Sequence, residues 1–67
     1  MTFTVRFSTD NAAFSEDDGE DTGAAMGAEI ARILRAVARA VNDGAENGDT
    51  GTVHDVNGNT VGVWSLA

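Results

Sequence analysis

The sequence predicts a small α+β domain, in which a three-stranded antiparallel sheet carries one amphipathic helix packed on one face. Apolar residues recur at helical spacing over residues 24–41, and three shorter stretches before and after them have the patterns of strands. The elements follow one another as strand, helix and hairpin. A right-handed crossover then places the last strand between the other two, in the order 1-3-2. The 67 residues suit a single compact domain, residues 1–67, with an acidic loop at about residues 15–23.

The first strand is predicted at residues 2–8, where polar and apolar side chains alternate. Phe3, Val5 and Phe7 fall on one face of this strand, and the other face is polar. The pattern is typical of a half-buried strand whose apolar face contributes to the core. Each of these side chains stabilises the fold by roughly 1.5–3 kcal/mol where it is fully buried.

The helix is predicted from Ala24 to Val41. Its apolar stripe, roughly 100° wide around the helix axis, comprises Met26, Ile30, Ile33, Leu34, Val37 and Val41. The opposite side, interpreted as a solvated face with charges paired to neighbouring carboxylates, carries Arg32, Arg35 and Arg39. Gly44 follows the helix and suits the left-handed conformation that ends many helices.

The last two strands form a hairpin whose register is open to two interpretations. If residues 57–58 alone form the turn, Val53 is separated from Val61 and Val63. If residues 55–58 form a type I turn with its glycine in a left-handed bulge, Val53 opposes Val61. We favour the second interpretation because it directs the three valines together toward the helix.

In this register Asp55 opposes Asn59, and Trp64 lies on the sheet face that the helix leaves open. That open face would carry Thr2, Thr4, Arg6, Thr52, His54, Thr60 and Trp64. An exposed tryptophan is a candidate anchor for a protein partner. It could equally cover Gly62 on the same face, and the sequence leaves both roles open.

Between the first strand and the helix lies a polar segment with one isolated aromatic residue, Phe14, which we expect to pin the segment to the core. Five acids follow within six positions: Glu16, Asp17, Asp18, Glu20 and Asp21. They are a solvated loop or a row of carboxylates that imitates phosphates. Their spacing does not fit a calcium-binding loop. The last acids also precede the helix, where they suit its N-terminal dipole with Thr22 as N-cap.

The charge balance is strongly acidic, with eleven acids against four arginines and no lysine, for a formal net charge of −7. Such a chain repels nucleic acid and anionic membranes, because lysine and arginine supply the affinity for both. We therefore expect no direct binding of nucleic acid or membrane, and a basic protein as partner. The simpler alternative is that the acidity only keeps a small protein soluble.

Most catalytic chemistry is missing from the sequence, which has no cysteine, a single histidine, no glycine-rich phosphate loop and no nucleophile motif. His54 and Asp55 are neighbours in a strand and should point to opposite faces, so they do not form a dyad. We expect no enzymatic activity, no cofactor and no metal. The sequence also has no membrane-spanning run and no secretory signal, which predicts a soluble, unexported protein.

Three segments, TFTVRFSTDNAAF, EIARILRAVARAV and DVNGNTVGVW, together resemble small proteins encoded by phages and mobile elements of bacteria. More narrowly, the chain resembles a small anti-CRISPR protein that inhibits type I interference complexes, with type I-C as the narrower expectation. The resemblance spans nearly the whole chain except residues 16–23. It implies a non-enzymatic inhibitor, in the cytoplasm of the bacterial host, that binds a Cascade subunit and blocks target DNA. Some members of this class present carboxylates where DNA phosphates would lie.

The expected partner is therefore the basic DNA-binding surface of a Cascade subunit. We expect this chain to bind it as a monomer. The carboxylates expected at the contact are Glu16, Asp17, Asp18, Glu20 and Asp21, with a second cluster of Asp43, Glu46 and Asp49 near the other end of the helix. A second hypothesis is a small phage-encoded adaptor that binds a protein through Trp64 and the open sheet face. A structural component of the virion is a third.

Overall fold

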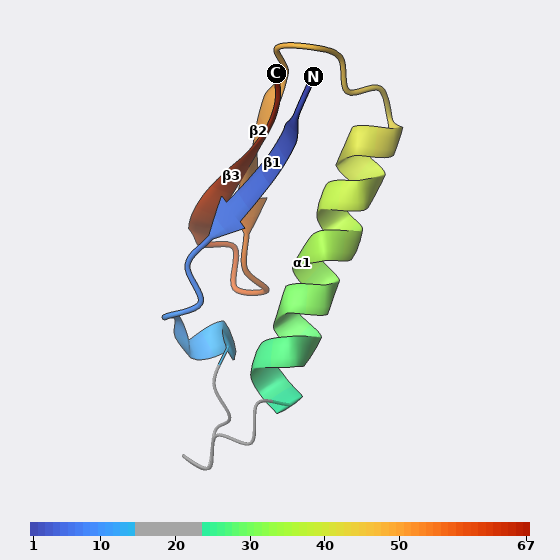
Figure 1. Cartoon of the computed structure of the whole chain (residues 1–67). Coiled ribbons are helices and arrows are strands. Elements are labelled where there is room, and N and C mark those ends of the chain that lie inside the picture. Colours follow the sequence, from blue (N-terminus) through green and yellow to red (C-terminus); the bar gives the residue numbers. More distant parts are fainter. Residues whose placement is uncertain (15–23) are drawn as a thin grey trace.

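The computed structural model describes residues 1–14 and 24–67. Within them it has the predicted α+β architecture, one long helix beside a three-stranded sheet (Figure 1). The elements are β1 (Phe3–Phe7), the 3-10 turn η1 (Ala12–Phe14), α1 (Ala24–Asn42), β2 (Thr50–His54) and β3 (Thr60–Leu66). The sheet order is β1-β3-β2, and both pairings are antiparallel, as the crossover argument predicts.

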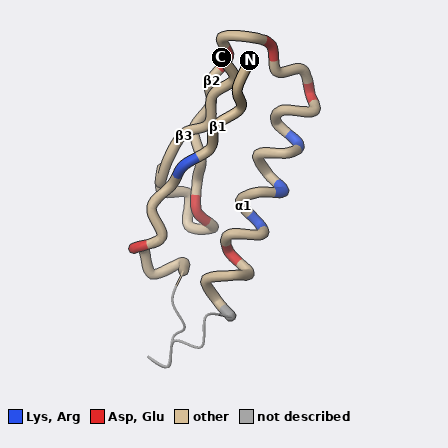
Figure 2. Tube along the Cα trace, in the orientation of Figure 1, with Lys and Arg blue, Asp and Glu red and all other residues tan. Residues whose placement is uncertain are grey.

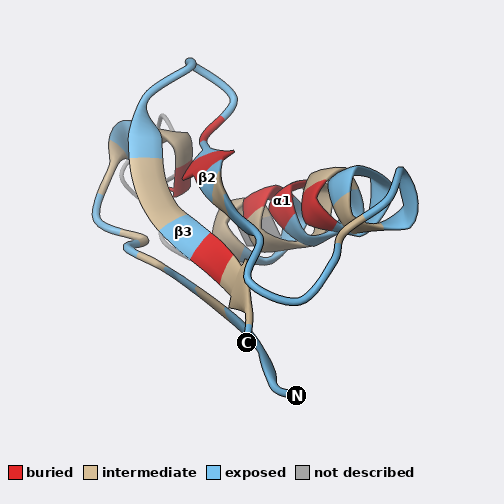
Figure 3. Ribbon diagram, turned by 90° about the horizontal axis from the view of Figure 1, so that it is seen from above, coloured by how far each residue is buried: buried red, intermediate tan, exposed pale blue. Residues whose placement is uncertain are grey.

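One face of the sheet packs against α1, and the strand register decides which residues it carries. Val5 pairs with Trp64, and Trp64 pairs with Gly51, so these three residues share a face. Trp64 is only 8% exposed. Figure 3 shows the buried residues of the helix and of the two later strands where helix and sheet meet.

The core is small and combines residues of η1, α1, β2 and β3, with Val5 and Phe7 of β1 packed against it. Its buried apolar residues are Phe14, Ile33, Val37, Val53 and Trp64. Phe14, 1% exposed, stacks on Phe7 with 6.3 Å between ring centroids, which confirms the predicted anchor. The predicted apolar stripe of α1 faces this core, with one departure: Leu34 is 45% exposed at the border of the helix–sheet contact.

The hairpin turn is the one predicted, but the predicted register beyond it is wrong. The amide of Gly58 donates to the carbonyl of Asp55 at 3.0 Å, and Gly58 has a φ of +85°, as a type I turn with a glycine bulge requires. Between Val53 and His54, however, the ladder contains a second irregularity: β3 advances two residues while β2 advances one. This bulge makes Val53 oppose Gly62 instead of Val61.

From Gly62 onward the bulge exchanges the two faces of β3, because a shift of one residue turns the side chains over. Val61, which precedes the shift, packs against the core as predicted. Val63, predicted to face the helix, is 49% exposed, and Trp64, predicted to be exposed, is buried. The ring of Trp64 lies over Gly51, where an added Cβ would overlap the indole. Trp64 therefore covers Gly51, and the predicted contact with Gly62 on an open face is wrong.

Substitution of Gly51 tests this packing. Gly51→Ala should destabilise the protein by about 1–3 kcal/mol, because its methyl group must displace the indole of Trp64. Gly27 is the matched control, since it is exposed in α1 and an added Cβ meets nothing within 4 Å. Gly27→Ala should stabilise the helix by roughly 0.5–1 kcal/mol. Urea unfolding followed by tryptophan fluorescence measures both, and equal effects would contradict the packing.

Two neighbouring helix residues test the extent of the core. Ile33 is 0% exposed and Leu34 is 45% exposed. Ile33→Ala should lower the free energy of unfolding by about 2–5 kcal/mol, because it leaves a cavity in the core. Leu34→Ala removes a half-exposed side chain from the same helix and should have a much smaller effect. Thermal unfolding measures both variants. A lower unfolding temperature for Leu34→Ala than for Ile33→Ala would contradict this assignment.

Candidate functional site

The second predicted acidic cluster lies in the connection between α1 and β2. Asp43, Glu46 and Asp49 are all exposed there. Figure 2 shows acidic positions along this connection. The carboxylate of Asp49 accepts a hydrogen bond from the amide of Glu46 at 2.8 Å, and the amide of Asp49 donates to the carbonyl of Glu46 at 2.9 Å. These two bonds close a turn from Glu46 to Asp49 and hold this part of the connection in one conformation.

Backbone hydrogen bonds also hold this connection at both of its ends. On the helix side, Gly44 has a φ of +131° and its amide donates to the carbonyl of Val41, as predicted for the helix end. On the sheet side, the amide of Leu66 donates to the carbonyl of Asp49, and the amide of Gly48 donates to the carbonyl of Leu66. The carboxylates of the second cluster therefore project from a loop that is held to the helix end and to the sheet.

The first predicted cluster lies outside the described residues. It comprises Glu16, Asp17, Asp18, Glu20 and Asp21, and the predicted N-cap Thr22 falls in the same segment. The described chain resumes at Ala24, where α1 begins.

Trp64, the remaining predicted contact residue, is not available to a partner in this fold. Its ring lies between the sheet and α1, and Phe3 packs beside it with 6.0 Å between ring centroids. The open sheet face instead carries exposed Val63, with Arg6 and Thr52 as its partners in the neighbouring strands. The hypothesis of an adaptor that binds a protein through Trp64 requires an exposed indole ring, and this ring is buried.

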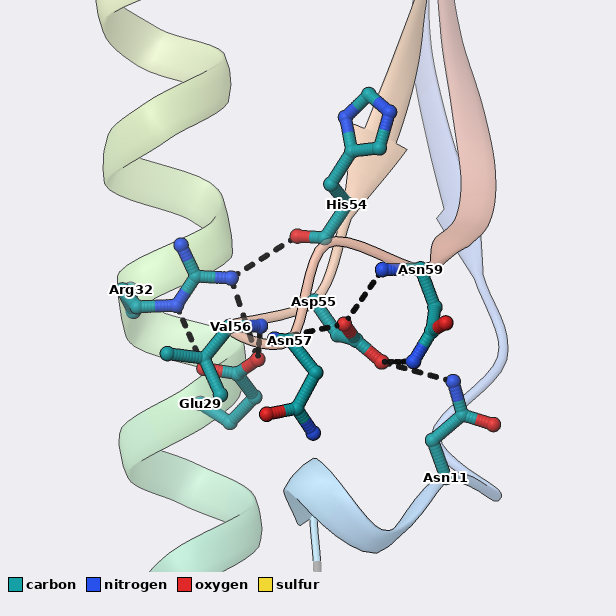
Figure 4. Close-up of polar contacts among 8 residues, drawn as sticks. All are labelled: Asn11, Glu29, Arg32, His54, Asp55, Val56, Asn57 and Asn59. Carbon is teal, nitrogen blue, oxygen red and sulfur yellow. Dashed lines mark hydrogen bonds and ion pairs between the residues drawn. The ribbon is translucent and has the colours of Figure 1, made fainter.

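Two further carboxylates, which the sequence analysis did not single out as buried, lie inside the protein. Asp55 is 3% exposed and sits at the start of the hairpin turn (Figure 4). Its oxygens accept hydrogen bonds from the backbone amides of Asn57 and Asn59, both at 2.9 Å, and from the side-chain amide of Asn59 at 3.1 Å. A fourth bond, at 2.8 Å, comes from the side-chain amide of Asn11. Asp55 therefore joins the turn to the segment before η1.

Glu29, 6% exposed, holds the same turn from the helix side. One of its oxygens accepts the amide of Val56 at 2.7 Å, and the Arg32 guanidinium donates to both oxygens, at 2.6 and 3.2 Å. The guanidinium also donates to the carbonyl of His54 at 2.9 Å. Arg32 was expected on a solvated face with a carboxylate partner; the pairing is confirmed, and its role in tying α1 to the hairpin is new.

Both buried carboxylates have pKa values below their ordinary ones. The pKa of Glu29 is lowered from 4.5 chiefly by the hydrogen bond from Arg32, which outweighs the effect of burial. For Asp55, burial is the largest single influence and raises the pKa. The hydrogen bonds from Asn11 and from the turn together outweigh it and hold the pKa below 3.8.

The side chains of His54 and Asp55 differ in their exposure. His54 is exposed and Asp55 is buried, so the prediction that they point apart is confirmed. Within residues 1–14 and 24–67, no group of three His, Cys, Asp or Glu side chains is placed to hold a metal ion. In the same part of the chain, α1 is not apolar enough over its length to cross a bilayer.

Comparison with protein-family models, with curated proteins and with solved structures finds no match to this chain. The geometry and charge of the chain itself are therefore what bear on its function.

The two buried carboxylates predict a specific dependence of stability on pH. Because their folded-state pKa values are depressed, they stabilise the fold above their ordinary values of 4.5 and 3.8, and this stabilisation is lost as the pH falls through the lower folded-state values. Urea unfolding between pH 7 and pH 2 should show stability falling below about pH 4.5. The variants Glu29→Gln and Asp55→Asn should be less stable than the wild type at pH 7, and their free energy of unfolding should decrease less as the pH is lowered.

The control is Asp43→Asn, which removes an exposed carboxylate outside this hydrogen-bond network. At pH 7 it should change the free energy of unfolding by less than either buried variant. If the free energy of unfolding of Glu29→Gln and of Asp55→Asn depended on pH as it does in the wild type, these two carboxylates would not be the cause of the loss of stability in acid.

Proposed function

We propose that this chain is a non-enzymatic inhibitor of the anti-CRISPR kind, which binds a Cascade subunit of a type I system and blocks target DNA through carboxylates that stand in for DNA phosphates. The observation that carries the proposal is the fixed presentation of Asp43, Glu46 and Asp49 at the end of α1. In a chain of net charge −7, such a surface favours a basic partner.

Apart from Asp10, whose carboxylate accepts a hydrogen bond from the Ser8 hydroxyl at 3.0 Å, the described carboxylates divide into two groups, which supports this interpretation. Glu29 and Asp55 are buried, and their hydrogen bonds account for their presence in the fold. Asp43, Glu46 and Asp49 are exposed, and only Asp49 closes a turn with its carboxylate. Stability of the fold therefore does not explain the charge of Asp43 and Glu46.

A defined loop also favours binding over simple solvation. An inhibitor pays an entropic penalty for each side chain and loop that it orders on binding, and a loop already held by hydrogen bonds avoids part of it. The five acids at residues 16–21 would add charge near the start of α1 in the sequence, and an extended basic surface that binds DNA phosphates would attract both clusters. We therefore keep both clusters in the proposed contact.

The test is a gel-shift assay of purified type I-C Cascade on its target duplex, with and without this protein. The wild-type chain should abolish duplex binding, and added salt should weaken the inhibition because exposed charges are screened. Asp43→Asn/Glu46→Gln should raise the inhibitory concentration by roughly tenfold. Neutralisation of the five acids at residues 16–21 to asparagine or glutamine should raise it further.

Arg35→Gln/Arg39→Gln is the matched control, since it also removes two exposed charges, from the C-terminal half of α1, but makes the chain more acidic. It should inhibit at least as strongly as the wild type. Unchanged DNA binding in the presence of the wild-type chain, or equal weakening by the two double variants, would refute electrostatic blockade.

A further inference from the structure

β1 is an edge strand that α1 does not cover. Within residues 1–14 and 24–67 it pairs with β3 on one side only, while the edge strand at the other side of the sheet, β2, lies against α1 (Figure 3). The hydrogen-bond pattern between β1 and β3 determines which backbone amides and carbonyls of β1 do not bond to β3. Thr2 exchanges hydrogen bonds with Ala67, and the amide of Ser8 donates to the carbonyl of Val61. By alternation, the amides and carbonyls of Phe3, Val5 and Phe7 point away from β3.

The same three residues turn their side chains to the helix side of the sheet, where an apolar groove of about 380 Å³ lies between β1 and the C-terminal half of α1. Phe3 and Leu34, on its two walls, are 43% and 45% exposed. The full lining is Phe3, Val5, Leu34, Val37, Ala38, Val41 and Asn42. A free strand edge and an exposed apolar groove therefore lie side by side.

We propose that β1 pairs antiparallel with β1 of a second copy of this chain, so that two sheets join into one across a twofold axis at Val5. The sequence of the strand, Phe-Thr-Val-Arg-Phe, is nearly its own reverse. In the register that pairs all five residues, Val5 faces the partner's Val5, and Phe3 faces the partner's Phe7. Every free backbone group of β1 meets a free group of the partner.

The charges of this edge suit a second copy, although the whole chain is strongly acidic. Among the residues that the structure describes, the strand and the groove lining contain no carboxylate and one charged side chain, Arg6. In the proposed register Arg6 lies opposite the partner's Thr4, a neutral residue, so no like charges face each other directly. Two acidic molecules can therefore meet along β1 with the described carboxylate cluster Asp43, Glu46 and Asp49 outside the pairing.

The paired sheet would place both helices on one face and bring the two apolar grooves together at its centre. The aromatic rings of Phe3 and Phe7 would then cover apolar surface that is exposed in the single chain. This inference departs from the monomer expected from the sequence, and it does not depend on the proposed inhibition of Cascade.

The experiment is sedimentation velocity of the whole chain over a wide range of concentration, with variants at position 4. The wild type should convert from monomer to dimer as its concentration rises. Thr4→Glu places a carboxylate opposite the partner's Arg6 and should lower the dissociation constant, whereas Thr4→Lys opposes two cations and should raise it by roughly fivefold. The double variant Thr4→Lys/Arg6→Glu should restore the wild-type value.

Circular dichroism of each variant checks that the fold is kept, and Thr4 is an exposed residue on the open sheet face, where substitution is tolerated. A wild-type chain that sediments as a monomer at every concentration would overturn the proposal. So would Thr4→Glu and Thr4→Lys variants that change the dissociation constant in the same direction, because a contact elsewhere would not distinguish their charges.

Discussion

The hydrogen bonds that hold the hairpin turn from two sides are the interaction on which the rest of this structure depends. Glu29 on α1 accepts a hydrogen bond from the backbone amide of Val56 in the turn. Asp55, within the turn, accepts hydrogen bonds from the backbone amide of Asn59 and from the side-chain amide of Asn11. With so small a core, apolar burial fixes the distance between helix and sheet better than it fixes their alignment. The buried carboxylates supply directional bonds, and these set where along α1 the hairpin sits.

The sequence predicts the elements of this fold well because each has a strong local signal. Helical spacing from Ala24 onward, strand alternation around Val5, and the glycine of the turn all agree with the structure. The faces of the hairpin are predicted wrongly, because the bulge between Val53 and His54 has no signal in its own residues. A usable signal existed across the sheet: Gly51 is the position opposite Trp64 where only a glycine leaves room for the indole.

The candidate site was predictable only in part, for a physical reason. An acidic residue in the sequence carries the same formal charge whether it is exposed or buried. Glu29 and Asp55 stabilise the fold through amides and a guanidinium that come from distant parts of the chain, and such partners appear only once the chain is folded. Asp43, Glu46 and Asp49 lie next to the end of a predicted helix, so their common exposed position followed from local sequence.

The segment that contains the five acids is bounded by two independently fixed points. Before it, Phe14 is buried and Asn11 is bonded to Asp55; after it, α1 packs on the core through Ile33 and Val37. The described parts on the two sides of this segment are therefore joined to one another by the hydrogen bond between Asn11 and Asp55 and by the core that Phe14 shares with Ile33 and Val37.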